Sequence, residues 1–417
     1  MAGISIRDRC RIVWNEDRDG FVGIMCRNGE FTVHFPLGFP VSQEEKELRK
    51  DIFLLMGTIS VHAGRKGSEV PGRTNDSQSR SFPFQAYLSI LHDFFARGYY
   101  REREHRYQVA KRGKIHWGRT IRSVKPCVQN QNVFYLEFVT GKRNVKEDEL
   151  ITLIHEYCVY EAFAGLGWLF TEAMPGRPRL KYNKKRFTAA VMDKLQGTFQ
   201  DKNKELFRNM LAVIRYLGER DQERDFQYGT WYFEHVWERL IDRVFGIPNK
   251  KDYYPQAFWE TDTREGRRVY ESSLRPDTIM LYGGDVYVLD AKYYQYGVTG
   301  DPKTLPSAPD INKQITYGEY IAEQEKFRQR HGEGCKVYNA FLIPFDRGVR
   351  LWAGAGEMMR LGQARGSWKS GRKEYEKVQG ILVDLKYLMK LSVREDENEI
   401  ARLAECIRRY VNAACPS

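Results

Sequence analysis

One segment constrains the fold of this chain more than any other: SSLRPDTIMLYGGDVYVLDAKYYQYG, residues 272–297. Two apolar runs flank Gly283–Gly284, and a pair of glycines is typical of the two-residue turn of a β-hairpin. A turn at this place sets Asp277 opposite Asp290. Because side chains alternate between the two faces of a strand, Lys292 is predicted on the same face as both acids.

The predicted register has a chemical consequence. It pairs Ile279 with Val288, so the face that carries the acids is otherwise apolar. Two carboxylates across a strand pair lie only about 5 Å apart and repel each other. A divalent cation offsets this repulsion, because it binds hard oxygen ligands and completes its shell with water. We therefore predict Mg²⁺, with Mn²⁺ as an alternative, bound by Asp277 and Asp290, with Lys292 serving the attacking water or the developing charge.

The chain also contains a second Asp-x-Lys string, Asp384-Leu385-Lys386, on another apolar run. This second string has no Pro-Asp partner across a turn. A short string of this kind predicts little by itself, and the alternative for residues 272–297 is a hairpin with two chance acids. What favours a site there is the combination of Pro-Asp, turn, apolar strand and Asp-x-Lys in one register.

The strings RPD at 275–277 and VYVLDAKYY at 286–294 resemble the core of the PD-(D/E)xK nucleases. In that superfamily a preceding helix often contributes a third acid. The resemblance implies Glu238 in this role, on a helix expected over 230–248, with Glu234 one turn earlier as the alternative. Glu234 lies nearer the apolar edge of that helix, and a solvated surface acid is the other interpretation of each.

The segment DINKQITYGEY, residues 310–320, resembles the glutamine–tyrosine element that follows the core in related nucleases. This likeness implies a catalytic role for Gln314 and a contact of Tyr317 with DNA. Residues three apart on a helix face the same way, so the two side chains are predicted to act together. Ordinary helix packing of Tyr317 is the alternative.

The segments LDAKYY and DINKQ, together with GYYREREHRYQVAKRGKIHWGRT at 98–120, resemble LlaJI-type restriction endonucleases, relatives of the McrC nuclease subunits. The likeness is good over about 225–345 and patchy over 95–120. It implies cleavage of double-stranded DNA in bacterial defence and a partner AAA+ GTPase of the McrB type. The sequence has no G-x-x-x-x-G-K-[ST] loop, which fits a nuclease subunit and equally a stand-alone enzyme.

Positive charge is concentrated in two runs of this chain, whose net charge is +12. Residues 95–126 and 176–187 are rich in lysine and arginine interleaved with aromatic side chains. Cations hold phosphates and aromatic rings stack on bases, so both runs are predicted to contact DNA. An ordinary solvated surface is the alternative. The predicted contacts are Arg101, Arg103, Arg106, Lys111, Arg112, Lys114, Arg119, Lys181, Lys184 and Lys185.

These patterns predict an α/β (α+β) protein of two domains. Residues 1–220 are expected to form a basic, aromatic-rich mixed α/β domain for DNA binding or partner docking. Residues 221–417 are expected to form the nuclease domain, a mixed sheet flanked by helices. Helices are expected over 84–104, 146–170, 203–221, 230–248, 311–332 and 397–414, and strands over 132–141, 336–345 and 378–391.

Several classes of protein are not expected. No run reaches the roughly 18 apolar residues of a membrane span, and the N-terminus is charged too early for a signal peptide. Scattered cysteines without a C-x-x-C pair argue against a disulfide or zinc framework. We therefore expect a cytoplasmic bacterial protein, for which a homodimer is an option. The alternatives to an active restriction nuclease are a DNA-binding or assembly subunit with an idle nuclease fold, or a nuclease of RNA or repair.

Overall fold

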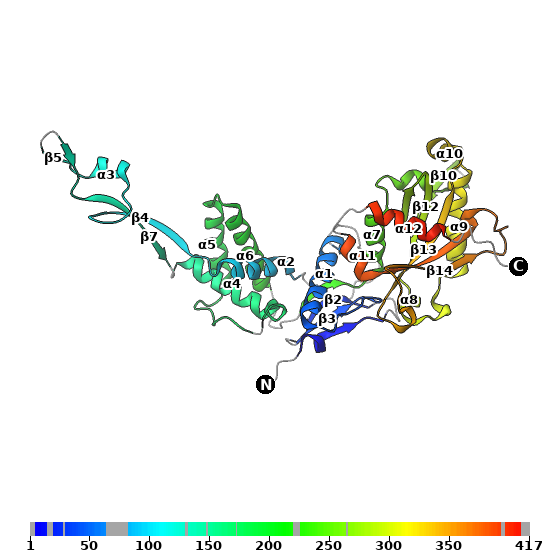
Figure 1. Ribbon diagram of the computed structural model, residues 1–417, viewed down its shortest axis with the longest axis horizontal. Coiled ribbons are helices and arrows are strands. Elements are labelled where there is room, and N and C mark those ends of the chain that lie inside the picture. The colour runs from blue at the N-terminus through cyan, green and yellow to red at the C-terminus, as the bar shows by residue number, and fades with distance from the viewer. Residues whose placement is uncertain are drawn as a thin grey trace. The chain divides into compact units, whose positions relative to one another are not determined.

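The computed structural model of the chain divides into two compact units (Figure 1). One unit spans Arg80–Arg224, and the other joins Ala2–Ser79 to Asp225–Ser417. The residues that the structure describes are 5–14, 20–27, 30–63, 82–129, 132–146, 149–171, 173–219, 226–263, 266–392 and 397–409.

The predicted domain of residues 1–220 is wrong in its first part, which folds with the C-terminal half instead. Strands β1 (Cys10–Ile12), β2 (Val22–Arg27) and β3 (Glu30–Phe35) form a sheet with β8 (Phe226–Thr230), in the order β1-β3-β2-β8. Strand β2 pairs antiparallel with β3 on one side and with β8 on the other. The helical unit is therefore an insertion between two strands of one sheet.

The helices of the first unit pack against one another as a small bundle. They are α2 (Phe84–Arg97), α4 (Leu150–Leu166), α5 (Lys184–Gln196) and α6 (Asp201–Glu219). Helix α4 is buried around most of its circumference, as its nearly uncharged sequence predicts. The helix expected over 84–104 is shorter, because its C-cap Gly98 takes a positive φ of 73° and the chain turns into a strand.

The strand that follows, β4 (Glu102–Ala110), pairs antiparallel with β7 (Phe138–Lys146). Between them lie α3 (Trp117–Ser123) and the short strands β5 (Cys127–Gln129) and β6 (Asn132–Phe134). The strand expected over 132–141 is thus two strands with a break between them.

The second unit is organised by a five-stranded mixed sheet in the order β11-β12-β13-β15-β14. Strands β12, β13 and β15 are parallel, whereas β11 and β14 are antiparallel to their neighbours. All nine residues of β13 are buried, which is typical of a central parallel strand. The strand bounds are Thr278–Tyr282 (β11), Asp285–Ala291 (β12), Val337–Phe345 (β13), Met358–Arg365 (β14) and Lys377–Asp384 (β15).

Helices cover both faces of this sheet (Figure 1). Tyr317 and Ile321 of α9 pack on Val286 and Val288, so α9 covers that face. The intervening Tyr287 points to the opposite face, where Arg408 of α12 lies 5.5 Å from its ring. Helices α7 and α11 contact each other, and α7 contacts α12. The helix bounds are Glu45–Ala63 (α1), Phe233–Phe245 (α7), Tyr296–Thr299 (α8), Ala308–Glu323 (α9), Glu325–His331 (α10), Leu385–Leu391 (α11) and Glu397–Arg408 (α12).

Some elements differ from the sequence-based expectation. The hairpin of β9 (Gln256–Thr263) and β10 (Gly266–Ser273) is not predicted, and the region 378–391 is half strand and half helix. Over the described ranges no helix is both long enough and apolar enough to cross a membrane. Short 3₁₀ helices occur at Ile6–Arg9, Gly167–Leu169, Lys250–Tyr253, Pro302–Thr304, Arg350–Trp352 and Glu374–Glu376.

Candidate active site

The hairpin of β11 and β12 has the predicted register. Ile279 lies opposite Val288, and the turn is made by Gly283–Gly284 with φ angles of 60° and 83°. A tight turn with positive φ at both central residues matches the twist of the strands and suits glycine above all. The ladder begins at Thr278, so Asp277 lies one residue before the strand itself.

The carboxylate of Asp277 is nevertheless held beside β12. Its Oδ2 accepts a hydrogen bond of 2.9 Å from the backbone N–H of Ala291, the neighbour of Asp290. Lys250 Nζ donates to the backbone carbonyl of Asp277. Asp290 itself is buried, with 3% of its surface exposed. One acid therefore enters the site from the residue before β11 and the other from β12.

The electrostatics of Asp277 reflect this crowding. Burial, the charge of Asp290 and the charge of Glu238 raise the pKa of Asp277 to about 7, against the lowering effects of the Ala291 N–H and Lys292. A shift in this direction means that the site disfavours a second negative charge unless a cation is present.

The structure separates the two candidates for a third acid on α7. Glu238 is close enough for its charge to act on Asp277, whereas the charge of Glu234 acts on the buried hydroxyl of Tyr293. The Glu238 side chain is 42% exposed and lies 3.5 Å from His235 Nδ1. The placement of these side chains favours Glu238 over Glu234 as the acid that supports the cluster.

Lys292 is held between two carboxylates. Its Nζ lies 2.8 Å from Asp290 Oδ2 and 2.9 Å from Asp310 Oδ1, and its side chain is 14% exposed. Burial lowers the pKa of Lys292, but Asp290 and Asp310 outweigh it and raise the pKa above its usual value. The sequence-based prediction did not include Asp310. The signal for it is the S-x-x-D pattern from Ser307 at the start of α9, which marks a capping box.

Gln314 and Tyr317 lie in the interior. Gln314 Nε2 donates 2.7 Å to the carbonyl of Val288, and its Oε1 is buried without a hydrogen-bond partner among the described residues. The Tyr317 ring is fully buried, and its hydroxyl donates 3.1 Å to the carbonyl of Arg275. The predicted contact of Tyr317 with DNA is therefore not supported, and helix packing explains the residue.

The second Asp-x-Lys string has structural partners instead. Asp384 caps α11 by accepting 2.8 Å from the N–H of Tyr387, and its other oxygen accepts 2.6 Å from Arg347 Nε. Lys386 lies 2.6 Å from Asp51 of α1, not beside Asp384. The same short string thus builds a helix cap and an ion pair here.

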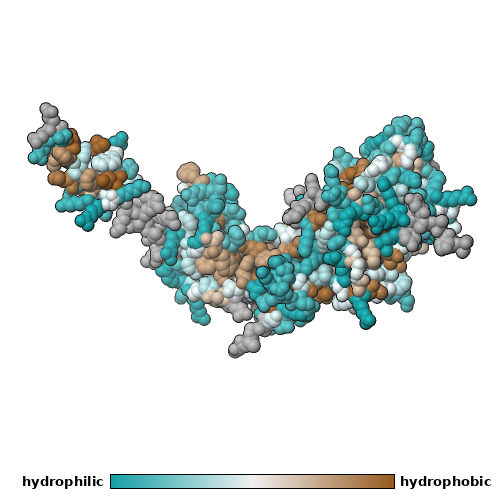
Figure 2. Space-filling view, in the orientation of Figure 1, coloured by the Kyte–Doolittle hydropathy of each residue, from teal (hydrophilic) through white to brown (hydrophobic). Residues whose placement is uncertain are grey.

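The DNA contacts predicted in the two basic runs belong to the unit Arg80–Arg224. Lys111, Arg112 and Lys114 are exposed, and the Arg119 guanidinium lies 4.0 Å from the Tyr107 ring centre. Figure 2 shows hydrophobic surface around α3. Arg101, Lys181 and Lys185 are also exposed, and Lys184 is half-buried; the side chains of Arg103 and Arg106 lie outside the described residues.

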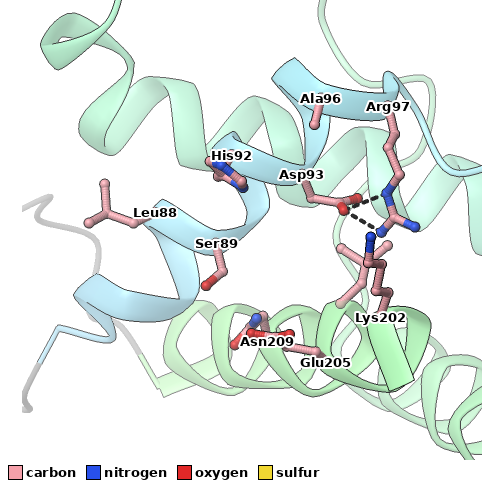
Figure 3. Close-up of a pocket in the computed structure, with 10 residues that line it drawn as sticks. Leu88, Ser89, His92, Asp93, Ala96, Arg97, Lys202, Glu205 and Asn209 are labelled. Carbon is pink, nitrogen blue, oxygen red and sulfur yellow. Dashed lines mark hydrogen bonds and ion pairs between the residues drawn. The ribbon is translucent and has the colours of Figure 1, made fainter. Parts of the chain in front are cut away.

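A cavity of about 480 Å³ lies between α2 and α6 of the helical unit (Figure 3). Side chains of both charges line it, among them Lys202 and Glu205 of α6. Asp93 and Arg97 of α2 pair across one turn, with Arg97 Nε 2.7 Å from Asp93 Oδ1. This balanced lining is typical of a solvated groove, so the hairpin cluster remains the stronger candidate site.

The acids of the hairpin do not form a complete metal cage. Within the described part of the chain, no group of three or more His, Cys, Asp or Glu side chains is arranged to hold a metal ion. The cluster instead offers two carboxylates, an ammonium group and an acid on α7 at longer range.

Comparison with known proteins identifies the family of the chain. The sequence model of the LlaJI restriction endonuclease family matches residues 21–354. The "Type II restriction enzyme BsuMI component YdjA" of Bacillus subtilis (strain 168) is 28% identical over 269 residues, 59% of this chain and 55% of that protein. The match thus spans about half the length of that relative.

A solved structure also aligns, at 16% identity and a TM-score of 0.32, over 89% of this chain and 82% of its own. It is the refined half-complex from the tetradecameric assembly of Thermococcus gammatolerans McrB AAA+ hexamers with bound McrC. The family match, which covers most of the sequence, is the finding that identifies the protein: the chain belongs to the LlaJI restriction endonuclease family.

Proposed function

We propose that this protein is the nuclease of a bacterial restriction system and hydrolyses phosphodiester bonds of double-stranded DNA with Mg²⁺. The observation that carries the proposal is the convergence of Asp277, Asp290 and Lys292 at one end of the β11–β12 hairpin. The arrangement resembles a PD-(D/E)xK core. Family membership supports the same class of reaction.

The donor set fits Mg²⁺ or Mn²⁺. Mg²⁺ is usually bound by one or two carboxylates, while water and substrate phosphate fill the remaining positions, so a three-acid cage is not required. Asp277 and Asp290 would hold the ion, which neutralises the repulsion that raises the pKa of Asp277. Gln314 Oε1, buried without a hydrogen-bond partner among the described residues, is a further acceptor on a side chain that bonds to β12 through its Nε2.

Each side chain then has a defined task. When bound, the metal ion supplies a water of lowered pKa and positive charge beside the scissile phosphate. The Lys292 ammonium orients the attacking oxygen and stabilises negative charge on the phosphate in the transition state. Glu238 on α7 would add a third negative charge near the ion. Gln314 holds β12 in place by its hydrogen bond to the carbonyl of Val288.

The direct test is plasmid cleavage by purified protein with Mg²⁺. Asp277→Ala and Lys292→Ala should abolish cleavage while DNA binding, followed by fluorescence anisotropy, stays largely intact. Lys386→Ala removes the lysine of the second Asp-x-Lys string and should leave the cleavage rate of the folded protein unchanged. Cleavage at the wild-type rate by Asp277→Ala would show that the hairpin cluster is not the active site.

We further propose that the protein works with separate subunits, among them an AAA+ GTPase of the McrB type. The word "component" in the name of the Bacillus subtilis relative, of which this chain matches only 55%, supports separate subunits. The AAA+ GTPase is what the resemblance of LDAKYY and DINKQ to LlaJI-type enzymes implies. An assembly subunit with an idle nuclease fold is the competing function. Calorimetric titration separates the two, because an idle site would bind neither Mg²⁺ nor Mn²⁺ and its Asp277→Ala variant would behave like the wild type.

A further inference from the structure

Lys292 has an anchor that does not depend on Asp290. Asp310 enters from the first turn of α9, while Asp290 belongs to β12, the strand that carries Lys292 itself. The two carboxylates lie at nearly equal distances from Nζ, 2.8 Å and 2.9 Å. The ammonium group is therefore fixed from two separate elements of the fold.

The carboxylate of Asp310 is rigidly oriented. Its Oδ2 accepts hydrogen bonds from the N–H of Ser307 at 2.9 Å and from the Ser307 hydroxyl at 2.7 Å. Its Oδ1 is thereby left facing Lys292. The third position of a helix also favours an acid, because the helix dipole is positive there. The same positive end of α9 would repel the ammonium group of Lys292, and the carboxylate of Asp310 offsets this repulsion.

We propose that Asp310 is the positioning residue for Lys292 and keeps the ammonium group in place when Asp290 turns its charge to the metal ion. The inference rests on the proposed nuclease function. Asp290 pairs with Lys292 and is also proposed to bind the metal ion. A carboxylate that binds a metal ion attracts a neighbouring ammonium group less strongly. Asp310 is not proposed to bind the ion, and its other oxygen accepts two hydrogen bonds from Ser307.

The chain contains a matched control for this arrangement. Asp51, which is more deeply buried than Asp310, likewise accepts a hydrogen bond from a serine N–H, that of Ser42, and pairs with the lysine of an Asp-x-Lys string, Lys386. The chemistry is nearly the same, but this pair joins α1 to α11, and neither residue belongs to the hairpin cluster of Asp277, Asp290 and Lys292. Loss of the Asp51–Lys386 pair should affect stability alone.

The experiment compares Asp310→Asn, Asp310→Glu, Ser307→Ala and Asp51→Asn in single-turnover cleavage, DNA binding and thermal unfolding. Asparagine keeps the acceptor for Ser307 but removes the charge that faces Lys292. We expect Asp310→Asn to cleave about 10- to 100-fold more slowly with unchanged DNA affinity, since small misplacement of a catalytic group has effects of this size. Asp310→Glu should recover part of the rate, and Asp51→Asn should cleave as the wild type does.

A second readout needs no cleavage. Acetylation of Lys292 by a lysine-directed reagent, measured by mass spectrometry on metal-free protein, should be faster in Asp310→Asn than in wild type or Asp51→Asn. A capping role alone predicts instead that Ser307→Ala is as damaging as Asp310→Asn and that Lys292 labelling is unchanged; this result would overturn the inference. If Lys292→Ala is inactive while Asp310→Asn cleaves normally, only the positioning role fails; if Lys292→Ala is active, the proposed function fails.

Discussion

The substitution Asp277→Asn tests the electrostatics of the cluster directly. Asparagine has nearly the size of aspartate and keeps an oxygen that accepts from the N–H of Ala291. It removes only the charge that burial and Asp290 disfavour. In metal-free protein near pH 8 we therefore expect the variant to be more stable than the wild type, although the residue is proposed to be essential for cleavage.

The magnitude follows from the pKa of Asp277, which rises from 3.8 to about 7. Each tenfold change in proton affinity corresponds to about 1.4 kcal/mol, so the ionised side chain destabilises the folded state by at most about 4 kcal/mol. Asp277 is only half-buried, and solvent and neighbouring groups relax around the charge. We expect Asp277→Asn to raise the free energy of unfolding by about 1–3 kcal/mol, which corresponds to roughly 3–10 °C in Tm for a unit of this size.

The pH dependence has a defined sign. Between about pH 4 and pH 7 the folded protein keeps a proton on Asp277 that the unfolded chain has released, so wild-type stability falls as the pH rises through this window. The variant lacks this group. The difference in Tm between the two should be near zero at pH 4 and complete above pH 7, as measured by differential scanning fluorimetry in chelator.

Two further measurements make the experiment decisive. Addition of Mg²⁺ should raise the Tm of the wild type and have less effect on Asp277→Asn, because a ligand stabilises the state that binds it. Asp384→Asn is the control, since Asp384 has its charge satisfied by Arg347 and should lose about 1–3 kcal/mol at pH 8. The reasoning is refuted if Asp277→Asn is less stable than the wild type at pH 8, or if its effect does not vary with pH.

Three other predictions concern the same region. Mg²⁺ affinity, measured by calorimetry, should fall about tenfold from pH 8 to pH 6, because the raised pKa of Asp277 makes protons compete with the ion. Glu238→Gln should slow cleavage and lower the pKa of Asp277, whereas Glu234→Gln should leave that pKa unchanged; NMR titration of the Asp277 carboxyl distinguishes them. Tyr317→Phe should lower stability by about 1 kcal/mol in chemical denaturation without weakening DNA binding, since its buried hydroxyl donates to the carbonyl of Arg275.

The hairpin could be predicted from sequence because its determinants are local. The turn at Gly283–Gly284 fixes which residues face each other, and alternation then fixes the shared face of Asp277 and Asp290. The contact between Lys292 and Asp310 lacks such a local rule. It depends on how α9 lies across the sheet, which is decided by the packing of residues such as Tyr317. A capping box predicts where α9 begins but not what its acid will face.

The same distinction explains the error in the domain boundary. Strand β8 is only five residues long, FQYGT, and it contains a glycine, so nothing in its own sequence shows that it completes a sheet begun by β2. The sheet is closed by a contact between segments that the whole helical unit separates along the chain. A change in composition at the end of the insertion indicates a boundary there, but not that the chain returns to an earlier fold.

The two Asp-x-Lys strings show how far local pattern extends into function. In Asp290-Ala291-Lys292 the strand continues to Ala291, so Asp290 and Lys292 pair with each other, and the Ala291 N–H between them donates to Asp277. In Asp384-Leu385-Lys386 the strand ends at the acid and a helix begins, so the acid caps the helix and the lysine turns to α1. Two Asp-x-Lys strings therefore place their acid and lysine side by side only where the backbone stays extended through the middle residue. The conformation at the middle residue, not the string, decides whether a lysine joins an acidic site.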